Sequence, residues 1–215
     1  MAKVVNGLLV GRMGNMVYYV VNGVQYSRIY VKPKNPKTTQ QQVRRKKIQV
    51  CTKFLKNFWE VIKIGYPSQD IAIKKFNEAF NYHMDNAMEE FKLPDSTETS
   101  FRVIPEKVQL AAGLINAPEI YSCQRNDRQI ELTWNPKLGP LPNLYSDQVV
   151  LTAYIPGQKA FVEFYMGTRK QGGGTVELPI YFSQPVHLWV FYWNSEQKRK
   201  ALKERISNSV YLGVV

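Results

Sequence analysis

The order of the hydrophobic periodicities along the chain restricts its fold more than any other feature. Residues 4–31 are rich in β-branched and aromatic side chains, as strands are, and residues 39–91 carry apolar side chains at helical spacing. Residues 117–215 return to short strand-like runs separated by turn residues. This order predicts an α+β fold in which a block of helices separates two blocks of strands.

The first block predicts a small antiparallel sheet. Its strand-like runs are Leu8 to Val10, Met16 to Val21 and Val24 to Val31. Asn22 and Gly23 stand between the last two runs and predict a type I′ hairpin, because both central positions of that turn require positive φ.

Two amphipathic helices are predicted, over 39–64 and 69–91. Thr38 is a suitable N-cap for the first helix, and Gln41 stands where the partner of a capping box is found. We expect the two helices to be antiparallel and to cover one face of the N-terminal sheet. Residues 1–92 would then form one basic α+β domain.

The remainder of the chain predicts an all-β domain behind a linker. Residues 93–116 are less periodic, and we expect a linker there with an extended segment from Phe101 to Ile104. About seven short strands within 117–215 predict a β-sandwich that resembles immunoglobulin or fibronectin type III modules. Trp134 is expected to be the inward-facing aromatic residue of an early strand. This architecture does not fix a function.

The run Val186–Trp193 is apolar on both alternating faces. One face is expected to fill the core of the sandwich, while His187 and the aromatic residues Trp189, Phe191 and Trp193 face outward. Two interpretations remain open. The outward row is covered by another part of the chain, or Trp189, Phe191 and Trp193 form a subunit interface.

The net charge of +12 is confined to the first 63 residues, which hold thirteen lysines and arginines and the single acid Glu60. Residues 64–215 carry equal numbers of acids and bases. Such segregation indicates a negatively charged partner. The residues expected to bind that partner or polyanion are Lys32, Lys34, Lys37, Arg44, Arg45, Lys46 and Lys47.

Three interpretations account for this charge. The consecutive cations at 44–47 surround the first turns of the predicted helix, where they oppose its macrodipole, and an acidic protein surface would offset them. Nucleic acid is the second interpretation, with Tyr18, Tyr26 and Tyr30 available for stacking, although no nucleic-acid motif occurs in the sequence. The third is a solvated charged face.

No catalytic constellation occurs in the sequence. His83 and His187 have no neighbours at metal-ligand spacing, and no Gly-x-Ser-x-Gly motif is present. His83 is expected to be a packing or surface residue. We therefore expect a protein that is not an enzyme and that has no cofactor, no metal and no small-molecule substrate. No apolar run has the length that a bilayer requires, so no membrane partner is expected.

The run Lys-Pro-Lys-Asn-Pro-Lys-Thr at 32–38, followed by Gln41 and Arg45, resembles a motif of an uncharacterised family of Bacteroidota and their phages. The segments Gly11–Asn15 and Ser209–Gly213 fit the same pattern. That family has no known activity and no known site residues, so the resemblance implies no catalytic role. It implies a structural or assembly role in a bacteriophage.

The leading hypothesis is a non-enzymatic structural or assembly protein, present in several copies in the neck, connector or tail of a virion. It would be synthesised in the cytoplasm of the bacterial host. Its partners would be other copies of itself and other virion proteins, with DNA as a further candidate. The alternative is a cytoplasmic nucleic-acid-binding protein that uses the Arg44–Lys47 cluster.

Overall fold

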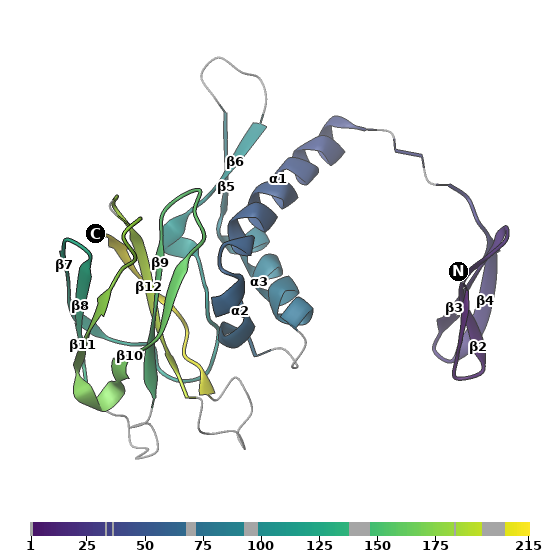
Figure 1. The fold of residues 1–215 in the computed structure, drawn as a ribbon. Coiled ribbons are helices and arrows are strands. Elements are labelled where there is room, and N and C mark those ends of the chain that lie inside the picture. The colour runs from purple at the N-terminus through teal and green to yellow at the C-terminus, as the bar shows by residue number, and fades with distance from the viewer. Residues whose placement is uncertain are drawn as a thin grey trace. The chain divides into compact units, whose positions relative to one another are not determined.

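The computed structural model divides the chain into two compact units, Met1–Thr39 and Gln40–Val215 (Figure 1). Each unit is described by itself. The structure describes the residues 2–32, 34–35, 37–67, 72–92, 99–137, 147–182, 184–194 and 205–215.

The first unit is a four-stranded antiparallel meander with the strand order β1-β2-β3-β4. Its strands are β1 (Lys3–Val5), β2 (Leu8–Met13), β3 (Met16–Val21) and β4 (Val24–Ile29). The predicted hairpin is confirmed, because Asn22 and Gly23 have φ values of 51° and 82°. Asn6 and Gly7, with φ values of 50° and 78°, close the β1–β2 turn in the same way.

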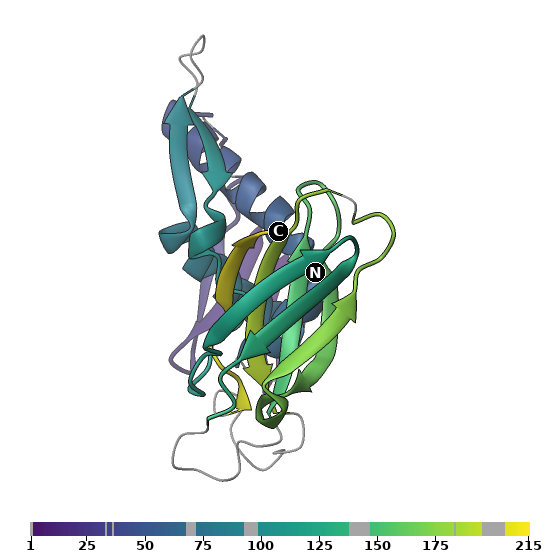
Figure 2. The same cartoon turned by 90° about the vertical axis from the view of Figure 1, so that its left-hand side faces the viewer.

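The second unit contains a two-sheet sandwich, and Figure 2 shows its three-stranded sheet in front of its four-stranded sheet. The three-stranded sheet has the order β11-β8-β7 and the four-stranded sheet has the order β10-β9-β12-β13. The strands are β7 (Ile120–Asn126), β8 (Gln129–Trp134), β9 (Gln148–Tyr154), β10 (Phe161–Thr168), β11 (Gly173–Glu177), β12 (His187–Trp193) and β13 (Val210–Val214).

The core between these sheets follows the alternation of the sequence. Ile130, Leu132 and Trp134 on β8 are fully buried, which confirms Trp134 as an inward-facing aromatic residue. The inner face of β12 contributes Leu188 and Val190 to the same core. The predicted two-sheet sandwich is thus confirmed, while its finer likeness to immunoglobulin or fibronectin type III modules stays a prediction.

The predicted single helix over 39–64 is instead two helices, α1 (Thr39–Lys56) and α2 (Trp59–Gly65). The chain is interrupted at Asn57 and Phe58, where backbone hydrogen bonds reach back three residues rather than four. Phe58 is fully buried there, with ring centroids 4.8 Å from Tyr154 and 5.6 Å from Trp189. The interruption accompanies the insertion of this ring against the sheet.

The predicted helix over 69–91 is shorter than expected. Helix α3 (Ala72–Asn86) ends before Met88, and residues 69–71 lie outside the described part of the chain. The residues that follow form β5 (Met88–Lys92), which pairs with β6 (Thr99–Val103). The composition of residues 88–92 favours a helix. Pairing with β6 stabilises a strand instead, and it includes an ion pair of 2.5 Å between Glu89 and Arg102.

The helices cover the four-stranded sheet of the sandwich, and the division into Met1–Thr39 and Gln40–Val215 differs from the predicted grouping of 1–92 as one domain. Leu55 and Val61 of the helices share a buried cluster with Val150, Trp189 and Phe191 of the sheet. Strands β9 and β12 are apolar on both faces, so the sheet requires cover on both sides.

The predicted linker over 93–116 is part of this same core, apart from residues 93–98, which lie outside the described residues. Leu110 and Ala111 are fully buried against the helices and the sheet. The amide N–H of Ala112 donates a hydrogen bond of 2.7 Å to the carbonyl oxygen of Gly65. The segment 99–116 lacks regular apolar spacing, and it is held in place by contacts with elements that are distant in the sequence.

A buried ion pair lies at one end of the sandwich, where the chain passes from β10 to β11. A guanidinium nitrogen of Arg169 lies 3.5 Å from a carboxylate oxygen of Asp147, and the two side chains are 4% and 0% exposed. The guanidinium also lies 3.9 Å from the ring centroid of Tyr192. Asn194 donates a hydrogen bond of 2.8 Å to the carboxylate of Asp147. These contacts offset part of the desolvation of the two charges.

Arg169→Ala should lower the free energy of unfolding by about 3–5 kcal/mol, because it removes the cation beside the buried carboxylate of Asp147. Arg128→Ala is the matched control, since it breaks a surface pair of 2.7 Å with Glu177 and should cost less than about 1 kcal/mol. Urea denaturation followed by circular dichroism measures both. Equal losses for the two variants would contradict this assignment.

Candidate docking surface and cavity

The N-terminal unit lacks a core of its own. None of its described residues is classed as buried, although it forms four paired strands. Apolar side chains at its surface include Val24, Ile29 and Val31, which are 54%, 62% and 72% exposed. A small sheet is marginal in water unless one of its faces packs against something else. This unit therefore presents an incomplete fold.

Both faces of this sheet carry apolar groups. Because Arg12 is opposite Val17, and Val17 is opposite Arg28, these three side chains share one face. Tyr19 and Tyr26 are opposite each other, with ring centroids 5.8 Å apart. The other face carries a methionine and isoleucine row, Met13, Met16 and Ile29.

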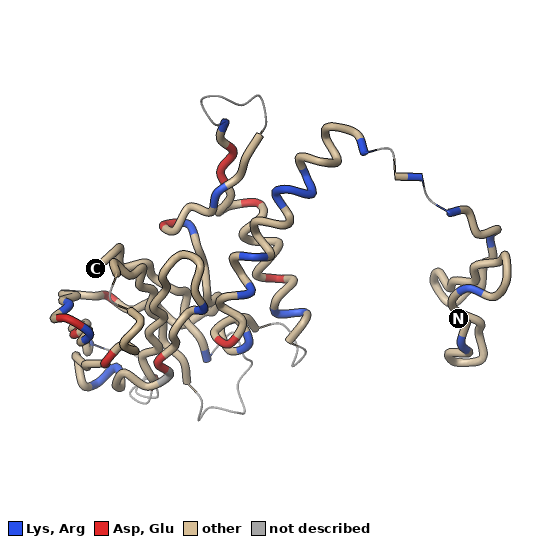
Figure 3. The backbone as a smooth tube through the Cα atoms, turned by 45° about the horizontal axis from the view of Figure 1, so that its top comes forward, with Lys and Arg blue, Asp and Glu red and all other residues tan. Residues whose placement is uncertain are grey.

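Cations are spread along the N-terminal unit without any acid, and the first acid of the chain is Glu60 (Figure 3). Of the predicted binding residues, Lys32, Lys34 and Lys37 are exposed and belong to this unit. The guanidinium of Arg12 lies 3.7 Å from the ring centroid of Tyr30, so part of the cationic surface is built on aromatic rings.

The other predicted binding residues belong to the second unit. Arg44, Arg45 and Lys46 are exposed and Lys47 is half-buried on helix α1, which has no acid in its first turn. The structure thus places all seven predicted residues at the surface of their own units, on consecutive stretches of one chain.

The predicted subunit interface is not available at the surface. Trp189 and Phe191 are 1% and 0% exposed beneath the helices, and Trp193 is half-buried against the same cluster. Their outward direction from the sandwich is as expected, but the chain's own helices cover them. The alternative, a row covered by another part of the chain, is what the structure shows.

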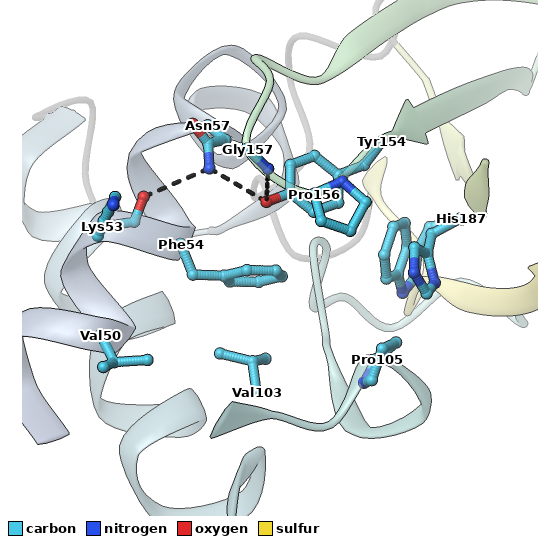
Figure 4. A pocket seen from close by; sticks show the side chains of 11 residues that line it. Val50, Lys53, Phe54, Asn57, Val103, Pro105, Tyr154, Pro156, Gly157 and His187 are labelled. Carbon is cyan, nitrogen blue, oxygen red and sulfur yellow. Dashed lines mark hydrogen bonds between the residues drawn. The ribbon is translucent and has the colours of Figure 1, made fainter. Parts of the chain in front are cut away.

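A cavity of about 390 Å³ lies beside this row. Figure 4 shows it between helix α1 and the ends of strands β6, β9 and β12. It was not predicted, although Val50, Lys53, Phe54 and Asn57 recur at the spacing of one helix face. The opposite walls come from three other segments. Their residues are Val103, Pro105, Tyr154, Pro156, Gly157, His187 and Trp189.

Polar groups gather at one end of this cavity. The hydroxyl oxygen of Tyr154 accepts long hydrogen bonds of 3.4 Å from the Asn57 amide and from the Gly157 backbone N–H (Figure 4). Lys53 lies on the helix side of the cavity, and His187 lies across it (Figure 4). Nδ1 of His187 is 2.7 Å from the Tyr211 hydroxyl, and burial lowers the pKa of this histidine, against the opposing effect of Glu106.

The other histidine is a packing residue, as expected. His83 on α3 is fully buried, and its Nδ1 donates a hydrogen bond of 2.7 Å to the carbonyl oxygen of Ala79. Burial lowers the pKa of His83 to about 4. Among the described residues no group of three or more His, Cys, Asp or Glu side chains is arranged to hold a metal ion. No helix formed by those residues is long and apolar enough to cross a bilayer.

These features define a β-sandwich protein that has helices on one sheet and a cationic sheet at its N-terminus. The chain belongs to the family of unknown function DUF6266, whose model matches residues 8–213. This confirms the predicted membership of an uncharacterised family.

No curated protein matches the chain. Among solved structures, domains d3–d4 of the extracellular region of rat CD45 match with 13% identity and a TM-score of 0.27. The match covers 59% of this chain and 64% of that chain, which is less than two thirds of its length.

His83 should make the protein less stable as the pH falls from 6.5 to about 4. In this range the unfolded chain binds a proton that the folded protein excludes, so stability falls with pH, by about 3 kcal/mol in all. The measurement is urea denaturation at pH 4, 5, 6 and 7. His83→Gln should flatten this part of the pH profile, while the control His187→Gln should largely retain it. Identical slopes in the wild type and in His83→Gln would contradict the prediction.

Proposed function

We propose that this chain is a non-enzymatic structural or assembly protein that docks through its cationic N-terminal residues onto an acidic surface of another protein. The observation that carries the proposal is the N-terminal unit, which has four paired strands, no acid and, among its described residues, none that is buried. Such a unit gains its missing apolar contacts and its missing counter-charges together when it docks.

A protein partner fits this unit better than nucleic acid. Phosphates and bases would satisfy the cations and the Tyr19–Tyr26 pair, but a phosphate backbone offers no apolar surface for Met13, Met16 and Ile29. An acidic protein surface with an apolar centre satisfies both kinds of group.

The acidic partner is, in this proposal, a different chain. Residues 1–39 hold six bases and no acid, and residues 40–215 also hold more bases than acids. Docking of the N-terminal unit on a second copy would bring like charges together. Contacts between copies, if the particle holds several, would use other surfaces.

The setting that we propose is a bacteriophage particle, where the protein would be a multi-copy component of the neck, connector or tail. The resemblance of the segment 32–38, with Gln41 and Arg45, to phage-encoded proteins supports this setting.

Replacing Arg44, Arg45, Lys46 and Lys47 together by Gln should weaken the binding of full-length protein to fluorescent poly-glutamate by roughly tenfold or more at low salt. Fluorescence anisotropy at two salt concentrations measures the affinity, which should fall as salt is raised. The matched control replaces four exposed lysines elsewhere, Lys92, Lys107, Lys137 and Lys159, by Gln and so removes the same charge.

The control variant should bind as the wild type does. An equal loss in both variants would show that only net charge matters and would contradict a defined surface. Tighter binding to duplex DNA than to poly-glutamate at the same salt would favour the nucleic-acid alternative.

Particles purified from the bacterium that carries this gene should contain the protein in a fixed ratio to the major capsid protein. Quantitative mass spectrometry of density-purified particles measures that ratio. Absence of the protein from such particles, with the protein present in the lysate, would contradict the virion setting and leave the docking proposal to the binding experiment.

A further inference from the structure

The cavity beside α1 contains a hydrogen-bond donor that the described residues leave unused. The Tyr154 hydroxyl oxygen already accepts from Asn57 and Gly157, so its own hydrogen is directed elsewhere, and no acceptor for it occurs among those residues. Tyr154 is 7% exposed, and its ring is held by edge-to-face contact with Phe54 at 5.6 Å. The donor is therefore buried and fixed in position.

A buried tryptophan also belongs to the lining. Nε1 of Trp189 has no hydrogen-bond partner within the described part of the chain, but this atom is shielded from solvent and the residue is 1% exposed. Trp189 therefore contributes its ring to the lining and not an accessible donor.

The charge of the lining has one sign. Lys53 is its only fully charged side chain, lies at the surface, and forms no ion pair in the part of the chain that the structure describes. No Asp or Glu lines the cavity. Glu106 acts electrostatically on His187, which lies across the cavity from Lys53. An anionic group is thus favoured at the Lys53 end.

The remaining walls are apolar. Val50, Phe54, Val103, Pro105 and Pro156 surround the space between the two ends. A volume of about 390 Å³ lies within the range of small-molecule sites. An apolar body fills such walls favourably, because its burial removes apolar surface from water.

We propose that this cavity binds a carboxylate on an apolar body. The carboxylate accepts from the Tyr154 hydroxyl and faces the Lys53 ammonium, while the apolar body lies along Phe54 and Trp189. The site shares no residue with the seven docking residues, although its residues Val50, Lys53 and Phe54 lie on the same helix α1 as Arg44–Lys47.

Isothermal titration of the full-length protein with decanoate, decanol and decylammonium tests the assignment, since the three probes share one apolar chain and differ in the head group. We expect decanoate to bind at one site per chain, decanol to bind roughly tenfold more weakly, and decylammonium not to bind. Acetyl-Leu-Leu-Phe with a free C-terminal carboxylate, titrated in parallel, distinguishes a peptide end from a free organic acid as the source of the carboxylate.

Two conservative variants locate the carboxylate. Tyr154→Phe removes the hydroxyl and keeps the ring, and Lys53→Gln removes the charge; each should weaken decanoate binding by roughly tenfold and leave decanol binding unchanged. The controls are Tyr121→Phe, at an exposed tyrosine away from the cavity, and Lys56→Gln, on the same helix but outside the lining. Thermal unfolding of each variant verifies that it is folded.

Three results would overturn the proposal. They are decylammonium binding as tightly as decanoate, unchanged decanoate affinity in folded Tyr154→Phe, and no binding of any carboxylate probe. Size-exclusion chromatography completes the test, because a dimer that excludes decanoate would make the cavity an interface between copies.

Discussion

The second unit depends on the cover that its four-stranded sheet receives on both faces. Trp189 and Phe191 alternate along β12 with residues of the sandwich core, so one strand supplies two separate buried clusters. The interruption of the helix at Phe58 brings an aromatic ring onto the outer face of this sheet. Burial of such large aromatic side chains on both faces is the main favourable term in this part of the fold.

The same packing creates the cavity. Helix α1 contacts the sheet through its later turns, and the side chains Val50, Phe54 and Asn57 leave a space against the strand ends. Tyr154 and Trp189 are placed by the contacts of their rings, and the positions of their polar atoms follow from that packing. The cavity that we propose as a binding site therefore results from how the aromatic core is assembled.

The N-terminal unit differs from the second unit in the cover of its sheet. Its strands pair well and its turns have the required positive φ values, yet no second layer covers them in the unit itself. The strands of this unit are thus paired in sequence order while burial is missing. Together with a charge of one sign, this makes the unit suited to completion by a partner, which is the basis of the proposed docking role.

The sequence by itself determined the local elements: the Asn22–Gly23 hairpin, the alternation that buries Trp134, and the confinement of the charge to the first 63 residues. These follow from side-chain periodicity and turn chemistry, which act over a few residues. Only the tertiary structure decided that Met88–Lys92 pairs as a strand, that Leu110 belongs to the core, and that the helices cover Trp189 and Phe191. Those outcomes depend on contacts between segments distant in sequence, whose burial outweighs local propensity.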